Sequence, residues 1–258
     1  MYRAGAMQLS AEELARYQRQ MMIDGWGERT QQALRASTVF VAGMGGLGSP
    51  VSIYLAVAGI GRLVVCDFDR VEHSNLNRQI LHDPSRVGTS KVVSAHATLT
   101  RLNPKIEVVA LDTLITEDNV DELVGNAQLI VDCMDNFETR YVLNDSAIRK
   151  GIPLVHGSVC GLEGRLTFIH VPETACLRCI FPAAPPRVVP PVLGATPGVI
   201  GALQAMEVVK YFAKVGSNLT GRLLAWDGGS MDFQSFRTQR DPKCSSCAAR
   251  PPGGPTRD

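Results

Sequence analysis

Short apolar runs alternate with longer segments of helical length between residues 37 and 159 of this chain. Runs that fit buried strands lie at 37–43, 62–69, 106–110, 127–136 and 152–159. Segments with helix start or stop signals lie between them, at 51–61, 90–102, 117–124 and 137–150. This strand–helix–strand alternation predicts an α/β fold, with a mostly parallel sheet and helices on both faces.

The pattern differs at both ends of the chain. Ahead of the first strand, Ser10 and Glu13 form a capping-box pattern that opens a helix over 11–22, and a second helix is predicted over 28–35. After residue 160, strands at 164–171 and 221–228 enclose a cysteine pair, a proline-rich stretch and a helix at 199–213. We therefore predict an antiparallel C-terminal extension of the same sheet.

The chain contains no low-complexity linker long enough to divide it, so we expect a single domain over 1–258. Residues 1–8 are predicted to form a loose leader. The proline- and glycine-rich residues 251–258 are predicted to form a disordered tail.

Composition excludes several classes of function. The 26 basic and 25 acidic side chains balance, and aromatic residues make up only 6%, so direct binding of nucleic acid is not expected. The apolar runs are too short for a membrane span, and the N-terminus lacks the apolar core of a signal peptide. We expect a cytoplasmic protein that does not contact a membrane.

A glycine-rich motif follows the first predicted strand and precedes a helix. Residues 43–48 read GMGGLG, which lets phosphate approach backbone N–H groups at a helix N-terminus. Asp67 ends the next strand, where an acid commonly binds ribose hydroxyls. The motif predicts a Rossmann-like nucleotide site, but enzymes of NAD, FAD, S-adenosylmethionine and ATP all use it.

Two cations follow the presumed ribose acid. Arg78 ends the polar segment SNLNR at 74–78, and Lys91 begins the next helix. An ATP enzyme needs such charges because the phosphates must be neutralised as bonds break, whereas hydride transfer has no such need. Each residue by itself also fits an ordinary solvated surface cation.

Four aspartates lie at strand ends. Because carboxyl ends of parallel strands share one edge of a sheet, side chains there are expected to converge. A carboxylate beside nucleotide phosphates is a natural Mg²⁺ ligand. For Asp132, a role at the helix entry is an equal alternative. The four residues are Asp67, Asp69, Asp132 and Asp135.

The seven cysteines divide into two C-x-x-C pairs and three isolated residues. The pairs suit a closed tetrahedral Zn²⁺ site, while a redox pair is disfavoured because neither pair is expected to open a helix after a strand. The isolated cysteines are predicted to be core thiols. The pairs are Cys176 with Cys179 and Cys244 with Cys247, and the isolated residues are Cys66, Cys133 and Cys160.

A set of motifs occurs in the order RYQRQ (16–20), GMGGLGS (43–49), DFD (67–69), SNLNRQ (74–79), VGTSK (87–91), DCMDN (132–136), CLRC (176–179), GVIGALQAMEVVK (198–210) and CSSC (244–247). Together they resemble the MoeB/ThiF/HesA family, bacterial relatives of ubiquitin-activating enzymes. That family adenylates the C-terminal Gly-Gly carboxylate of a ubiquitin-like sulfur-carrier protein of the MoaD or ThiS type. The resemblance therefore implies an adenylyltransferase that uses ATP and Mg²⁺ and contains structural Zn²⁺.

The resemblance also implies roles for individual residues. Catalysis is expected from Arg78, Lys91, Asp135 and Arg19, where Asp135 holds Mg²⁺ and Arg19 reaches into the partner subunit of a homodimer. Asp67 is expected to bind the ribose. Nucleotide-binding residues are expected at Gly43, Gly45, Gly46, Asp67, Asp69, Ser74, Asn75, Leu76, Asn77, Arg78, Lys91, Asp135 and Asn136.

The chain departs from many members of that family at one point. The segment between Cys179 and Cys244 contains no cysteine, so a covalent carrier–enzyme intermediate there is not expected. We expect activation only, with a separate sulfurtransferase acting downstream. The pathway stays open among molybdopterin, thiamine, thiolated tRNA and cysteine biosynthesis. The alternatives are adenylation of a small-molecule or tRNA-borne carboxylate, an NAD-linked oxidoreductase, and a non-catalytic scaffold.

Overall fold

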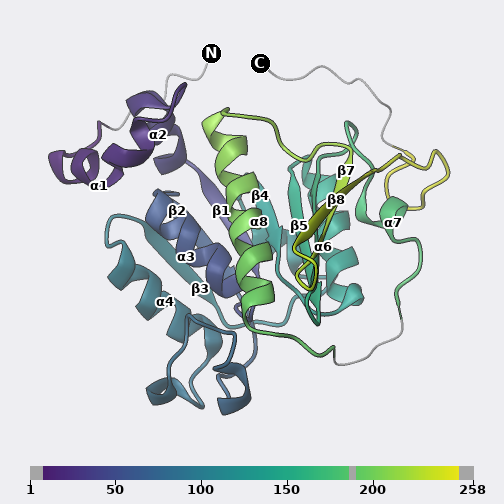
Figure 1. Cartoon of the computed structure of the whole chain (residues 1–258), viewed down its shortest axis with the longest axis horizontal. Helices are drawn as coiled ribbons and strands as arrows, with labels where there is room; N and C mark the ends of the chain where they lie inside the picture. Colours follow the sequence, from purple (N-terminus) through teal and green to yellow (C-terminus); the bar gives the residue numbers. More distant parts are fainter. Residues whose placement is uncertain (1–7, 186–189, 250–258) are drawn as a thin grey trace.

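One eight-stranded sheet forms the centre of the protein, with strand order β3-β2-β1-β4-β5-β6-β7-β8 (Figure 1). The computed structural model describes residues 8–185 and 190–249. Pairing is parallel from β3 through β5 and antiparallel from β5 through β8, which confirms the predicted fold class. The strands are β1 (Thr38–Ala42), β2 (Arg62–Cys66), β3 (Glu107–Leu111), β4 (Leu129–Asp132), β5 (Leu154–Cys160), β6 (Glu163–Ile169), β7 (Arg222–Asp227) and β8 (Asp232–Arg237).

Helices cover both faces of the sheet. Side chains of α3, α4 and α8 pack into one buried cluster with Val39 and Val41, while those of α5, α6 and α7 pack into another with Phe40 and Ala42. Successive residues of β1 therefore face opposite clusters, as strand geometry requires. The helices are α1 (Ala11–Met21), α2 (Gly27–Arg35), α3 (Gly48–Ala58), α4 (Lys91–Leu102), α5 (Val120–Val124), α6 (Phe137–Lys150), α7 (Leu177–Ile180) and α8 (Ala195–Ala213).

Several boundaries differ from the sequence-based predictions. The helix predicted over 51–61 begins at Gly48, so it follows the glycine motif directly. The helix predicted over 199–213 begins earlier, at Ala195. Pro197 is tolerated in its first turn, because backbone nitrogens in a first turn have no intrahelical hydrogen-bond partner. The strand predicted over 62–69 ends at Cys66, which leaves Asp67 and Asp69 in the loop that follows. β8 and α7 were not predicted.

The two ends of the chain are described only in part. Residues 1–7 of the predicted leader and the whole predicted tail at 251–258 lie outside the described residues. In the part of the chain that the structure describes, no helix has the length and apolar character needed to cross a membrane. The single domain over 1–258 and the cytoplasmic location stay predictions.

Candidate functional site

The glycine motif forms the turn between β1 and α3. Gly43 has φ +92°, and a Cβ there would lie 2.8 Å from the carbonyl oxygen of Cys133. A Cβ on Gly48 would lie 1.9 Å from the carbonyl oxygen of Gly43. Side chains at either position would break this turn. The turn delivers the N-terminus of α3 to the carboxyl edge of the parallel strands, where such folds bind ligands.

Asp67 contacts this turn from the end of β2. Its Oδ2 accepts a hydrogen bond from the Met44 N–H at 2.7 Å, and its Oδ1 accepts one from the Asp69 N–H at 2.8 Å. Burial raises the pKa of the Asp67 carboxyl, and the ammonium of Lys91 opposes that rise. The predicted ribose acid therefore lies against the glycine turn.

Lys91 begins α4 and forms an ion pair beside the same acid. Its Nζ lies 2.8 Å from Asp69 Oδ2. The Lys91 side chain is 8% exposed, whereas that of Asp69 is 50% exposed. The ammonium of Lys91 is therefore buried at this edge of the sheet, and the carboxylate that pairs with it remains accessible to solvent.

The segment at 74–78 also lies against the glycine turn. A Cβ on Gly46 would lie 3.6 Å from Arg78 Cγ and 3.3 Å from Pro197 Cγ. The glycine turn, Arg78 and the N-terminal turn of α8 therefore meet at one place. A Cβ on Gly45 would lie 3.5 Å from Nε2 of Gln79, a buried residue that our sequence-based site did not include.

The polar side chains of this segment form hydrogen bonds within their own loop. Arg78 Nη1 donates to the Ser74 carbonyl oxygen at 2.8 Å and to Asn77 Oδ1 at 2.9 Å. Asn75 is buried, and its Oδ1 accepts from the Glu72 N–H at 3.1 Å. Leu76 follows as the C-cap of the short helix at His73–Asn75. The Arg78 guanidinium thus folds back onto its own loop.

Asp135 and Asn136 occupy the turn between β4 and α6. Asn136 caps α6, because its Oδ1 accepts from the Thr139 N–H at 2.9 Å. Its Nδ2 donates to Asp135 Oδ1 at 3.4 Å. The side-chain oxygen of Asn136 therefore accepts a hydrogen bond from the first turn of α6. The exposed Asp135 carboxylate is the oxygen donor that fits a hard cation such as Mg²⁺.

Asp132 lies in the core, which corrects the predicted convergence of four carboxylates. Its side chain is fully buried, and its Oδ2 lies 2.6 Å from His156 Nδ1 and 3.9 Å from Arg140 Nε. Our sequence reasoning missed His156. Asp132 and His156 meet only through the pairing of β4 with β5, which no local pattern reveals.

Arg19 lies away from these residues. Its neighbour Gln20 donates from Nε2 to the carbonyl oxygen of Ala58, the last residue of α3, at 2.8 Å. The glycine turn lies at the other end of α3, about 16 Å away for 11 residues. Figure 1 shows α1 in the upper part of the view and the loops that link β2 to α4 in the lower part. Within the described residues, the exposed Arg19 forms no hydrogen bond or ion pair.

The two cysteine pairs come together, as their spacing predicted. The four sulfur atoms of Cys176, Cys179, Cys244 and Cys247 lie within 4.8 Å of one another. Individual Sγ–Sγ distances are 3.7, 3.6 and 3.5 Å. Four sulfurs placed tetrahedrally about 2.3 Å from Zn²⁺ would be ~3.8 Å apart. The thiolate set and its geometry therefore fit Zn²⁺ without major movement.

The environment of the cysteines differs from our expectation in two details. Cys176 is the N-cap of the four-residue helix α7, the next helix after β6, although neither pair was expected to open a helix after a strand. Cys160 is exposed, so its prediction as a core thiol was wrong. Cys66 and Cys133 are buried as predicted, and burial raises the pKa of Cys66 to about 12.

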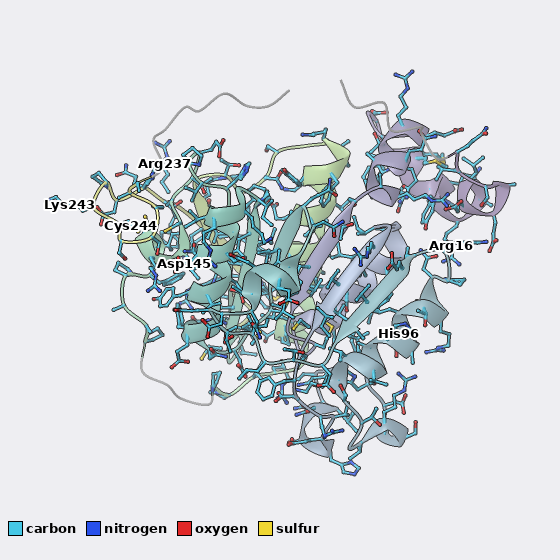
Figure 2. All side chains as sticks on the ribbon, turned by 180° about the vertical axis from the view of Figure 1, so that it is seen from behind. Arg16, His96, Asp145, Arg237, Lys243 and Cys244 are labelled. Carbon is cyan, nitrogen blue, oxygen red and sulfur yellow. The ribbon has the colours of Figure 1, made fainter. Side chains whose placement is uncertain are left out.

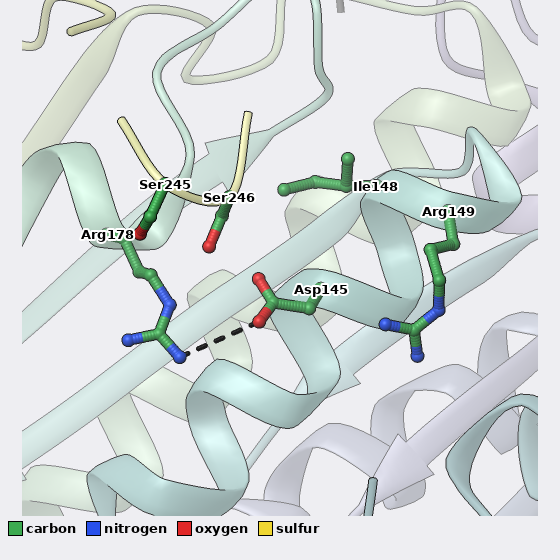
Figure 3. A pocket seen from close by; sticks show the side chains of 6 residues that line it. All are labelled: Asp145, Ile148, Arg149, Arg178, Ser245 and Ser246. Atoms are coloured by element: carbon green, nitrogen blue, oxygen red, sulfur yellow. Dashed lines mark ion pairs between the residues drawn. The ribbon is translucent and has the colours of Figure 1, made fainter. Parts of the chain in front are cut away.

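The cysteine cluster lies far from the first helices. Figure 2 shows Cys244 and Asp145 on the opposite side of the molecule from Arg16 and His96. A cavity of about 510 Å³ lies beside the cluster and was not predicted. Figure 3 shows Arg178 directed toward Asp145 across this cavity, with an ion pair of 3.6 Å. Arg178 also stacks on Tyr141, so it braces α7 against α6.

Comparisons with known proteins identify relatives over most of the chain. A model of the ThiF family matches residues 17–246. A Haloferax volcanii protein named "SAMP-activating enzyme E1" is 43% identical over 247 residues, covering 93% of this chain and 91% of that protein. A Mus musculus protein named "Adenylyltransferase and sulfurtransferase MOCS3" is 43% identical over 250 residues, covering 94% of this chain and 54% of that protein. The chain thus spans about half the length of the MOCS3 relatives.

Solved structures show the same fold at lower identity. The structure titled "Crystal structure of E. coli MccB + Succinimide" has a TM-score of 0.82 and 24% identity, covering 90% of this chain and 74% of that chain. The structure of E. coli MccB with ATP has a TM-score of 0.78 and 24% identity, covering 84% and 68%. These likenesses support the fold.

Proposed function

This chain belongs to the ThiF family, and from that premise we propose that it adenylates the C-terminal Gly-Gly carboxylate of a ubiquitin-like sulfur-carrier protein. One observation carries the proposal. The glycine turn meets Arg78 and the Asp67–Asp69–Lys91 group at the carboxyl edge of the sheet. The names of the relatives from Haloferax volcanii and Mus musculus support the same class of substrate.

The proposed reaction needs positioning more than a protein nucleophile. A carboxylate oxygen of the carrier attacks the α-phosphorus of ATP, and the bond between that phosphorus and the bridging oxygen to the β-phosphate breaks. Pyrophosphate leaves with the electron pair, and the carrier is left as an acyl-adenylate. Because the attacking oxygen is already anionic, catalysis consists of alignment and charge stabilisation.

The residues of the site have distinct parts in this proposal. Gly45 and Gly46 admit the nucleotide against the backbone, and Asp67 binds the ribose hydroxyls. Arg78 and Lys91 offset charge on the phosphates; both loop hydrogen bonds of Arg78 come from Nη1, which leaves Nη2 and Nε to donate to a phosphate. Asp135 would hold Mg²⁺, which when bound supplies further neutralisation of the phosphates.

We propose a homodimer in which Arg19 completes the active site of the partner. The far end of α3 separates Arg19 from the nucleotide residues of its own chain, so a direct role requires a second copy. The four-cysteine cluster is proposed to hold structural Zn²⁺, because four thiolates leave no open coordination position.

We further propose that the chain activates the carrier without forming a covalent bond to it. The segment between Cys179 and Cys244 contains no cysteine. A separate sulfurtransferase would then act on the acyl-adenylate. Which pathway uses the product depends on the carrier.

The decisive test mixes the purified protein with each candidate carrier, ATP and Mg²⁺. Mass spectrometry is then used to detect the carrier with added AMP, and radiolabelled pyrophosphate exchange into ATP measures turnover. A carrier that lacks its terminal Gly-Gly is the matched control and should give neither signal. If no carrier forms an adduct, the proposed function is wrong. Reduction of a nicotinamide cofactor without ATP consumption would instead favour an oxidoreductase.

A further inference from the structure

A fully buried histidine–aspartate pair lies beneath the turn that carries Asp135. Asp132 and His156 are direct cross-strand partners in the parallel pairing of β4 with β5. Both side chains are 0% exposed, and Nδ1 of His156 lies 2.6 Å from Oδ2 of Asp132. Burying polar groups costs free energy unless they are hydrogen-bonded. This short contact therefore offsets the cost of burying the two side chains.

The polar contact of His156 is directed at Asp132. Burial lowers the pKa of His156, so the imidazole is neutral and donates its Nδ1 hydrogen to the carboxylate. Within the described residues, Nε2 of His156 has no hydrogen-bond partner, and the ring packs against Phe181 with centroids 6.0 Å apart. The imidazole therefore fixes the position of the Asp132 carboxylate.

Asp132 in turn holds the backbone of Met134. Its Oδ1 accepts a hydrogen bond from the Met134 N–H at 3.0 Å. Arg140, whose Nε lies 3.9 Å from Asp132 Oδ2, donates from Nη2 to the Met134 carbonyl oxygen at 2.6 Å. The N–H and the carbonyl oxygen of Met134 are thus both bonded to buried side chains, those of Asp132 and Arg140.

Met134 links this group to the nucleotide edge. It directly precedes Asp135 and Asn136, and its Sδ lies 3.3 Å from the position of a Cβ on Gly43. The preceding carbonyl of Cys133 lies 2.8 Å from that same position. A shift of the 134–136 turn would therefore move Asp135 relative to the glycine turn.

We propose that His156 is a positioning residue: through Asp132 it holds the 134–136 turn so that Asp135 faces the phosphates and their metal ion. This inference rests on the proposed adenylation function for its catalytic consequence. Its structural part, the fixing of the turn by His156, holds without nucleotide or metal. Residues that hold a metal ligand in place without contacting the metal themselves affect metal affinity or activity strongly.

Three variants separate positioning from general stability. His156→Leu removes the donor, and His156→Asn retains a side-chain N–H close to the position of Nδ1. Thr167→Val is the matched control, because Thr167 is buried beside His156 in the pairing of β5 with β6 and bonds to the Arg222 carbonyl oxygen at 2.9 Å. Among the described residues, Thr167 forms no hydrogen bond with the 134–136 turn. His156→Ser, which leaves room for water, replaces His156→Leu if that variant does not fold.

The first readout is amide hydrogen exchange of the metal-free and nucleotide-free protein. We expect His156→Leu to accelerate exchange of the Met134 amide on the order of tenfold, by loss of the bond that Asp132 now accepts. His156→Asn and Thr167→Val should leave this amide protected. Equal protection in His156→Leu and wild type would overturn the positioning role.

The second readout is carrier-dependent pyrophosphate exchange. His156→Leu should lower kcat roughly 10–100-fold and raise the Mg²⁺ concentration for half-maximal rate, with KM for the carrier unchanged. His156→Asn should restore both values, and Thr167→Val should not alter them. An unchanged kcat and Mg²⁺ requirement in His156→Leu would contradict the proposal. If the wild-type protein shows no pyrophosphate exchange with any carrier, the proposed adenylation function is wrong. Amide hydrogen exchange of Met134 still decides whether His156 holds the turn.

Discussion

Lys91 Nζ lies 2.8 Å from Asp69 Oδ2, and the backbone N–H of Asp69 donates to Oδ1 of Asp67 at 2.8 Å. The ammonium is buried, while the Asp69 carboxylate remains half exposed. This chain of contacts places one cation beside the acid that we assign to the ribose.

Replacing Lys91 by Ala should abolish carrier-dependent pyrophosphate exchange. The lost stabilisation of phosphate charge is expected to cost on the order of 10²–10³ in rate. The fold should persist, because the half-exposed Asp69 is hydrated once its partner is removed. Lys105→Ala, which removes an exposed ion pair with Glu12, is the matched control. Near wild-type exchange in Lys91→Ala would rule out the assigned role.

Arg19→Ala and Lys91→Ala should complement each other when mixed. Each is expected to be inactive alone, because Arg19 serves the site of the partner and Lys91 serves its own. A mixed dimer contains one site with both residues intact, so random exchange of subunits should restore about a quarter of wild-type activity. The measurement is pyrophosphate exchange after mixing and incubation. Absence of any recovery, with subunit exchange verified by mass spectrometry, would argue against a shared site.

Cys179→Ser should weaken binding of the proposed Zn²⁺ and lower thermal stability. The proposed Zn²⁺ would link the 176–179 pair to the 244–247 pair, and its loss is expected to cost roughly 3 kcal/mol, or about 10 °C in Tm. Metal content by mass spectrometry and Tm by calorimetry give the two readouts. Cys160→Ser, a change at an exposed cysteine outside the cluster, should keep both values. Full zinc content in Cys179→Ser would contradict the proposed ligand set.

Two buried histidines should make stability depend on pH below 6.5. Burial lowers the pKa of His82 and of His156 from the ordinary value of 6.5. Below that value the unfolded chain binds protons that the folded chain does not, so the free energy of unfolding falls as pH drops from 6.5. The slope is at most ~1.4 kcal/mol per pH unit for each histidine. Above 6.5 this contribution is fully present.

Denaturant unfolding at pH 7, 6 and 5 measures that dependence. His156→Asn removes one of the two titrating groups, so its unfolding free energy should fall less steeply than that of wild type over this range. Carboxylates with lowered pKa, such as Asp121, lose their contribution at lower pH and do not interfere. Identical slopes for the two proteins would show that His156 does not contribute.

The elements that were predicted well depend on neighbours in the chain. The capping box of α1 is present, since Ser10 Oγ accepts from the Glu13 N–H and the Glu13 carboxylate accepts from the Ser10 N–H. The parallel strands follow from apolar runs that are buried on both faces. β8 was not predicted, because all its residues are exposed and its place depends on pairing with β7.

The sequence by itself determined the α/β class, through the alternation of short segments over 37–159, and it also determined the glycine turn and the two C-x-x-C pairs, because each of these motifs is encoded within a few consecutive residues. Only the tertiary structure decided which distant residues meet. The register of β4 against β5 buried Asp132 beside His156 and removed it from the exposed carboxylates. The packing of α1 on the far end of α3 separated Arg19 from the glycine turn. Such contacts depend on strand order and register, which the free energy of the whole core selects and no short segment specifies.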